Sequence, residues 1–181
     1  SAASDVYKRQ VFPPGTTTGR MMTNAGRTRS MGVELASTWK PTDDLTLRVS
    51  YGYTNATFRK YNDGRNDYRG KRVPYAPSNT LFGEVNWRIT PLRFMEVTPS
   101  LNVSARCVGN IYWNEANTVS QPFYCLPSVS VAFDAPHWSL RLWADNFTAT
   151  RYNTFYFVSI GNTFVQRGLP RLLGATVRVR I

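Results

Sequence analysis

The residue types that most often carry out chemistry in proteins are few in this chain and do not form a catalytic pattern. His137 is the one histidine, and it lies in a Pro-containing turn beside Trp138. A metal site needs several ligands, so a single histidine in a turn is interpreted as a polar turn residue. We find no Ser/His/Asp arrangement, no glycine-rich phosphate loop and no acids paired in a pocket. We therefore expect neither enzymatic activity nor a cofactor.

The two cysteines are a more informative pair. Cys107 and Cys125 end and begin two expected strands on either side of a long polar segment, and their positions put both side chains on one face. One hypothesis is a disulfide across the base of that loop, which an oxidising compartment would permit and for which the chain-entropy model gives about 3 kcal/mol. The alternative is two small apolar thiols at the rim of the sheet. The sequence leaves both open.

The elements that must position these residues are strands, because apolar residues recur with a period of two almost throughout. We expect an all-β chain with strands at 30–39, 45–54, 78–89, 94–107, 124–133, 138–146 and 169–181. The connections alternate between short turns, such as "KPTDD" and "DAPH", and long polar segments. Outer-membrane barrels alternate in this way, with short periplasmic turns and long extracellular loops.

The two faces of the expected strands differ in charge. One face carries apolar side chains, for example Leu45, Leu47 and Val49, whereas the charges fall on the other. Because an arginine or lysine facing lipid at the membrane midplane costs roughly 2–4 kcal/mol, a lipid-facing wall has to exclude charge. We expect the other face to line a lumen, with candidate residues for a solute path or for contact with a plug: Glu34, Arg48, Glu84, Arg88, Arg141 and Asp145. The ordinary alternative for them is a hydrated wall with weak ion pairs.

Alternation alone is also compatible with a soluble β-sandwich. The placement of large aromatic residues favours the membrane barrel, because they gather beside the short turns at one level of the sheet: Trp39, Trp87, Phe94, Phe133 and Trp138. Amphipathic rings favour the headgroup region, and a girdle of this kind marks a membrane interface.

Composition limits the other classes of protein. The 181 residues carry a formal net charge of +11, but no run of five basic residues occurs, so nucleic acid is not an expected partner. A hydrophobic content of 42% argues against disorder. No stretch of 18 apolar residues is present, so no transmembrane helix is expected.

We expect three segments along the chain. Residues 1–10 differ in character from the rest and are interpreted as a non-native tail at the broken end of a gene. Residues 11–29 are expected to end an extracellular loop, and residues 30–181 to form barrel strands. Because bacterial barrels have even strand numbers and no open edge in the membrane, an earlier strand should come before the loop.

From about Asn24 onward the chain resembles the end of a TonB-dependent outer-membrane receptor. The stretches that carry the resemblance are "NAGRTRSMGVELASTWKP", "YRGKRVPYAPSNT", "LWADNFTATRYNT" and "RGLPRLLGATVRVRI". The resemblance implies a transmembrane antiparallel β-barrel, of which this chain would be the last seven strands of about 22. It also implies import of a siderophore–iron complex, cobalamin or a glycan, driven by a TonB-type partner that acts through a plug upstream of this chain.

The same resemblance implies further partners. Outer-membrane lipid and lipopolysaccharide would surround the wall, and the barrel-assembly machinery would read the terminal strand, Thr176, Val177, Arg178, Val179, Arg180 and Ile181. The family usually ends in an aromatic residue, whereas this chain ends in Ile181.

Aromatic residues in the long loops are candidates for stacking on a ligand, and packing within the loops is the alternative role: Tyr112, Trp113, Tyr152, Tyr156 and Phe157. Two other functions remain open on the sequence. One is a porin-like passive channel, and the other is a soluble carbohydrate-binding β-sandwich.

Overall fold

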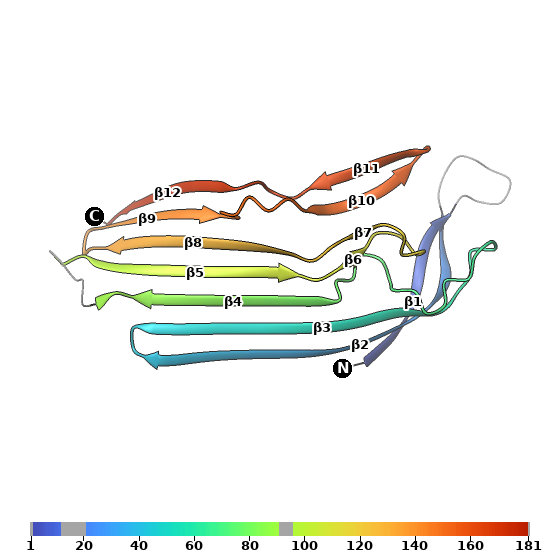
Figure 1. The fold of residues 1–181 in the computed structure, drawn as a ribbon, viewed down its shortest axis with the longest axis horizontal. Helices are drawn as coiled ribbons and strands as arrows, with labels where there is room; N and C mark the ends of the chain where they lie inside the picture. Colours follow the sequence, from blue (N-terminus) through green and yellow to red (C-terminus); the bar gives the residue numbers. More distant parts are fainter. Residues whose placement is uncertain (1, 12–20, 91–95, 181) are drawn as a thin grey trace. The chain divides into compact units, whose positions relative to one another are not determined.

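The chain folds into antiparallel strands (Figure 1). The structure, a computed structural model, describes residues 2–11, 21–90 and 96–180, with side chains from residue 26 onward. One sheet has the strand order β1-β2-β3-β4-β5-β8-β9-β12. Its strands are β1 (Ala2–Val11), β2 (Met21–Thr42), β3 (Leu45–Tyr61), β4 (Asn79–Arg88), β5 (Thr98–Val108), β8 (Tyr124–Asp134), β9 (Trp138–Asp145) and β12 (Leu172–Val179). Two small hairpins complete the fold: β6 (Ile111–Tyr112) with β7 (Ser120–Gln121), and β10 (Asn153–Ser159) with β11 (Asn162–Arg167).

All seven strands expected from the period of two are present, and the connections alternate in length as expected. Short connections follow β2 and β8, whereas long ones follow β3, β5 and β9 and span residues 62–78, 109–123 and 146–171. Within the described residues, no helix is long and apolar enough to cross a membrane.

Three strand boundaries differ from the sequence prediction by four residues or more. β2 begins at Met21 and β3 continues to Tyr61, so both run well beyond their apolar stretches. Backbone pairing holds these extensions: β1 pairs with β2, and Phe58 N–H donates to the carbonyl of Lys71 at 2.9 Å. β5 begins at Thr98 because Glu96 has a φ of 59°, which is outside the range of an extended strand. Phe94 lies outside the described residues.

The local structure of residues 21–29 differs from the loop that was expected. Residues 21–29 were expected to be part of a loop, but they lie in β2 and pair with β1 over the register Ala2↔Met31 to Val11↔Met21. The sequence "MMTNAGRTR" lacks the apolar alternation from which a strand is recognised, and main-chain pairing alone makes it one. That residues 1–10 are foreign to the protein stays a prediction.

Contacts divide the chain into two compact units. The first comprises Ser1–Val33, Tyr53–Ser78 and Asn110–Pro122. Its core is aromatic: Phe58 and Tyr61 are each 1% exposed with ring centroids 4.9 Å apart, and buried Trp113 packs on Tyr75. The long connections in this unit therefore have a small core of their own.

The second unit comprises Glu34–Gly52, Asn79–Gly109 and Phe123–Ile181. Its register puts apolar side chains opposite one another on one face, as in the rows Val85↔Val103↔Val129 and Leu101↔Val131↔Leu142. This apolar face is exposed: Leu35 is 64% and Val177 68% accessible. A sheet that leaves its apolar face open needs an apolar solvent, and lipid is such a solvent.

The candidate ligand-facing wall

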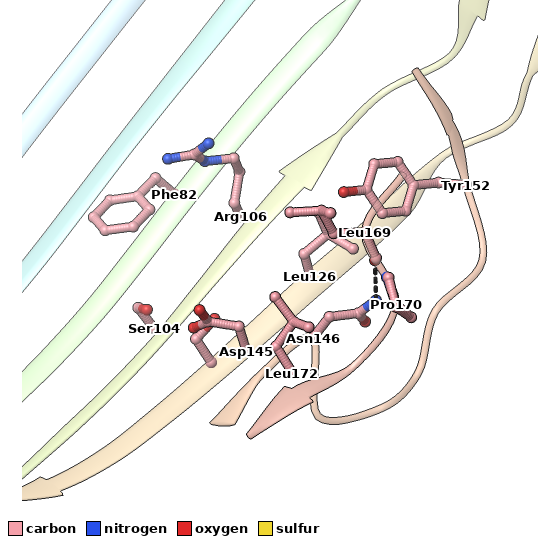
Figure 2. Close-up of a pocket in the computed structure, with 11 residues that line it drawn as sticks. Phe82, Ser104, Arg106, Leu126, Asp145, Asn146, Tyr152, Leu169, Pro170 and Leu172 are labelled. Carbon is pink, nitrogen blue, oxygen red and sulfur yellow. Dashed lines mark hydrogen bonds between the residues drawn. The ribbon is translucent and has the colours of Figure 1, made fainter. Parts of the chain in front are cut away.

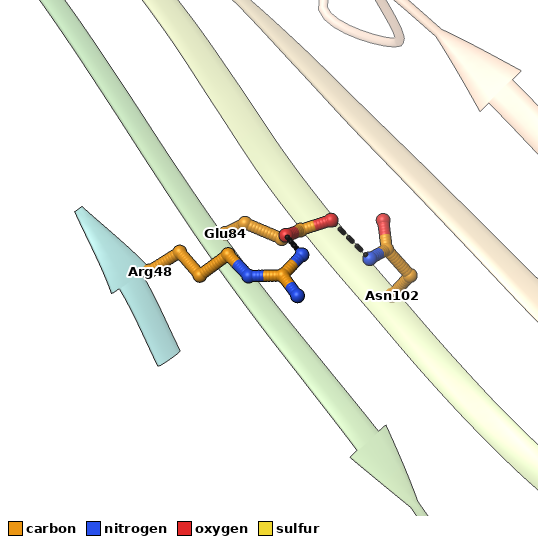
Figure 3. Close-up of polar contacts among 3 residues, drawn as sticks. All are labelled: Arg48, Glu84 and Asn102. Atoms are coloured by element: carbon orange, nitrogen blue, oxygen red, sulfur yellow. Dashed lines mark hydrogen bonds and ion pairs between the residues drawn. The ribbon is translucent and has the colours of Figure 1, made fainter. Parts of the chain in front are cut away.

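The polar face of the second unit carries an ordered network (Figure 3). Glu84 on β4 accepts from Arg48 Nη1 on β3 at 2.8 Å and from Asn102 Nδ2 on β5 at 2.8 Å. The two oxygens of one carboxylate thus connect three neighbouring strands. Because Arg48 is about half exposed, the ion pair contributes little energy, but it defines the direction of each side chain.

The other four lumen candidates do not join that network. Arg141 and Asp145 line one hollow on the polar face of β9. Arg88 lines another at the short-turn end, together with Asp44, Asp134 and Arg180. Glu34 lies beside Gly52, with its Cγ 3.9 Å from the position of a Cβ there. The structure therefore brings Arg48 and Glu84 together. The other four candidates are distributed along the polar face.

A hollow of about 310 Å³ lies on the polar face where β4, β5, β8, β9 and β12 meet the long connections (Figure 2). Apolar groups form much of its lining: Phe82, Leu126, Tyr152, Leu169, Pro170 and Leu172. Arg106 and Asp145 bring opposite charges to it. Neither forms an ion pair with any residue that the structure describes. Apolar walls with a few polar groups, at this volume, are typical of small-molecule sites.

Asn146 lies at the start of the 146–171 connection, which supplies Tyr152, Leu169 and Pro170 to the lining of this hollow. It is 5% exposed, its φ is 47°, and its Oδ1 accepts from Thr150 N–H at 2.9 Å. Its Nδ2 donates to the carbonyls of Thr150 and Leu169, at 2.9 and 3.3 Å. Asparagine is among the residues that best tolerate a left-handed backbone. One side chain thus holds both ends of the segment together.

Tyr152 is positioned by a glycine. Its ring lies where a side chain on Gly168 would be, and Gly168 N–H donates to the Tyr152 carbonyl at 2.9 Å. The ring also stacks on Tyr124, with ring centroids 4.7 Å apart and planes at 19°. Tyr152 therefore lines the hollow in a fixed orientation.

The remaining loop aromatics are not part of the lining of this hollow. Trp113 is 6% exposed against Tyr75, and Tyr112 belongs to β6. Phe157 on β10 stacks on Phe164 at 4.9 Å and is 44% exposed, and Tyr156 pairs across the hairpin with Val165. For Trp113 the geometry favours packing within the loop over contact with a ligand.

Cys107 and Cys125 lie directly opposite one another on β5 and β8 and are joined by a disulfide, with Cα atoms 4.0 Å apart. Arg106 and Leu126, one residue along each strand, also pair. Since successive side chains of a strand point to opposite faces, the disulfide lies on the apolar face and these two residues line the hollow behind it.

The terminal strand pairs along its whole length with β9, from Leu172↔Asp145 to Val179↔Trp138. Arg180 N–H donates to the carbonyl of His137 at 2.8 Å, which gives that turn residue a backbone role. Ile181 lies outside the described residues. Within the part of the chain that the structure describes, no three His, Cys, Asp or Glu side chains are grouped as metal ligands.

Sequence reasoning missed most residues of the hollow. Phe82, Leu126 and Leu172 are apolar residues at positions where the alternation predicts polar ones. These exceptions are the feature of the sequence from which the hollow could have been predicted. Trp143 is a similar case, because it lies over Gly174 of β12, where no Cβ would fit. Arg106 could not be distinguished from other polar-face charges without the register.

Comparisons with known proteins agree with this architecture. Residues 4–147 match the family model for the TonB dependent receptor-like β-barrel. The pesticin receptor of Yersinia pestis is 25% identical over 159 residues, which are 87% of this chain and 23% of that protein. The ferrioxamine receptor of Yersinia enterocolitica is 31% identical over 122 residues, 65% of this chain and 15% of that protein.

Among solved structures, the ferric yersiniabactin uptake receptor FyuA from Yersinia pestis superposes with a TM-score of 0.77 at 22% identity. The match covers 88% of this chain and 24% of the receptor. This chain thus spans between 15% and 24% of the length of these three proteins. Proteins of this family are receptors and transporters in the outer membrane and not enzymes. The chain belongs to the TonB-dependent receptor β-barrel family, as a partial barrel.

Proposed function

We propose that this chain is part of the barrel wall of an outer-membrane receptor that imports a ferric siderophore. The support is that relatives named for ferrioxamine and for ferric yersiniabactin match most of the chain. TonB would supply the energy through parts of the receptor outside this chain. Neither a porin-like channel nor a soluble carbohydrate-binding sandwich fits a member of this family.

The observation that carries the proposal is the hollow at the long-loop end of the polar face. It combines the unpaired guanidinium of Arg106 with the rings of Phe82 and Tyr152. Arginine binds oxygen-rich anions through several donors, and aromatic rings contact the flat parts of a ligand. A chelate whose iron is held by deprotonated oxygen ligands presents both kinds of surface.

The test uses the complete receptor, with Arg106→Ala and Tyr152→Ala made separately. Binding of ferric yersiniabactin and of ferrioxamine B is followed by quenching of tryptophan fluorescence, and growth is followed under iron limitation. We expect each substitution to weaken binding roughly tenfold, the effect of losing one charge-assisted hydrogen bond or one ring contact. Arg88→Ala, at the opposite end of the wall, is the matched control.

Two results would count against the proposal. If deletion of the receptor leaves growth on both siderophores unchanged, iron import through these ligands is rejected. If Arg106→Ala and Arg88→Ala have equal effects, the hollow is not the contact site.

Two further proposals concern the strands themselves. We propose that Thr176–Val179 and the residues after them are read by the barrel-assembly machinery, as the family resemblance implies. We also propose that Cys107 and Cys125 are disulfide-bonded in the cell, since the periplasm through which the chain passes is oxidising.

A further inference from the structure

Asp145 brings a negative charge into the hollow to which we assign an oxygen-rich iron chelate. Its side chain takes part in no hydrogen bond or ion pair with a residue that the structure describes. It lines both this hollow and a neighbouring one of about 360 Å³, as do Ser104 and Ser128, so the two hollows are continuous. A carboxylate repels the oxygen ligands of iron, and another part of the ligand has to be its partner.

The strand register separates Asp145 from the positive charge of the hollow (Figure 2). Arg106 on β5 pairs with Leu126 on β8, and the register of β8 with β9, continued by one pair, sets Asp145 beside Ser128. The two positions therefore differ by two strands and two residues. With 4.8 Å between strands and 3.3 Å per residue, the Cα atoms of Arg106 and Asp145 are about 12 Å apart. Opposite charges at this spacing suit the two ends of one small molecule.

Trp143 lies next to Asp145 on the same face of β9. It comes two residues earlier, about 7 Å along the strand, and its ring lies over Gly174 of β12 and lines the second hollow. A carboxylate and an aromatic ring both attract a positively charged nitrogen. Arg141, the other charged residue in that lining, is about 13 Å from Asp145 along the strand, which is beyond the Debye length of about 8 Å at physiological ionic strength.

We propose that Asp145, with Trp143 beside it, selects a ferric chelate that carries a free ammonium group. The inference rests on the proposed function, because the iron-bearing end would lie against Arg106, Phe82 and Tyr152. The ammonium arm would cross the two serines, whose short side chains leave room for it, and reach the carboxylate. A chelate without this positive group would cover the carboxylate and leave it without a partner, so it should bind more weakly.

The test uses the complete, detergent-purified receptor and two ferric chelates. Ferrioxamine B ends in a primary amine, and its N-acetyl derivative has the same iron-binding groups without that charge. Asp145→Asn keeps the size of the side chain and removes its charge. Asp134→Asn makes the same change in the hollow at the short-turn end and is the matched control. Binding is followed by quenching of tryptophan fluorescence.

The unmodified receptor should prefer ferrioxamine B over the acetylated chelate about fivefold, the effect of one partly exposed ion pair. Asp145→Asn should bind the two chelates equally, and Asp134→Asn should keep the full preference. Trp143→Leu should lower the preference about twofold through the loss of the ring. The ratio between two chelates isolates recognition of the charge, because a structural defect would weaken both alike.

Four results would overturn the inference. The first is equal binding of the two chelates by the unmodified receptor, and the second is a preference that survives in Asp145→Asn. The third is an equal loss of preference in Asp145→Asn and Asp134→Asn, which would assign the effect to the overall charge of the wall. The fourth is binding of ferric yersiniabactin with no binding of either ferrioxamine, which would leave the import function in place. Failure to bind all three chelates would reject the proposed function together with the inference.

Discussion

At the scale of single residues, Asn146 joins the two ends of the 146–171 connection. Its three hydrogen bonds satisfy backbone groups at both ends of the 146–171 connection, and its left-handed backbone turns the chain out of β9. A buried polar side chain with all its partners is costly to remove, because those partners then lose their hydrogen bonds.

Asn146→Ala should destabilise the receptor by about 2–3 kcal/mol, since it removes three buried hydrogen bonds and puts a less suitable residue at positive φ. The measurement is urea unfolding together with limited proteolysis of residues 147–168. Asn146→Asp keeps the acceptor but puts a buried carboxylate oxygen against the carbonyls of Thr150 and Leu169, so it should be at least as destabilising as Asn146→Ala. Unchanged proteolysis in both variants would contradict the role given to Asn146.

At the scale of elements, the pairing of β5 with β8 places the disulfide and the hollow at the same level on opposite faces of the sheet. The disulfide Cys107–Cys125 lies on one face, and Arg106 and Leu126, which line the hollow, lie on the other. A covalent bond between the strands at this level prevents them from separating next to the hollow.

Cys107→Ser/Cys125→Ser should therefore loosen the segment 109–123 and the outer end of the hollow. The chain-entropy model gives a loss of about 3 kcal/mol for a loop of this size. Hydrogen exchange of residues 106–126 measures the effect, with residues 98–103 on β5 as an internal reference. Thiol labelling of the denatured, unreduced receptor is the companion assay, and two free thiols there would rule the disulfide out.

The sequence predicted the membrane-spanning elements well and the outer elements poorly, for a physical reason. In strands such as β9 and β12, lipid on one side and water on the other force alternation, and the pattern is readable. β1 and the start of β2 are held by main-chain pairing, for which side-chain type matters little. The hollow was missed because its lining comes from segments far apart in the chain.

At the scale of the whole molecule, the exposed apolar face is what distinguishes this protein from a soluble one. In water, an exposed valine can be replaced by arginine at little cost, whereas the same change facing lipid costs about 2–4 kcal/mol near the midplane. A valine-to-arginine substitution on this face should therefore be tolerated if the face meets water and be destabilising if it meets lipid.

Val49→Arg should reduce the amount of folded receptor in the outer membrane, because Val49 is 53% exposed on the apolar face of β3. Ser50→Arg, the next residue and on the polar face, should be tolerated. The readout is the heat-modifiable fraction in outer-membrane preparations. Equal yields for the two variants would contradict a lipid-facing role for this side of the sheet.

The hydrogen bonds of Asn146 also have an evolutionary consequence. Because one side chain joins the start and the end of the 146–171 connection, the β10–β11 hairpin beyond it can change in length or sequence while β9 and β12 keep their register. The sequence of this hairpin can therefore diverge between related proteins while the strands on either side of it keep their pairing.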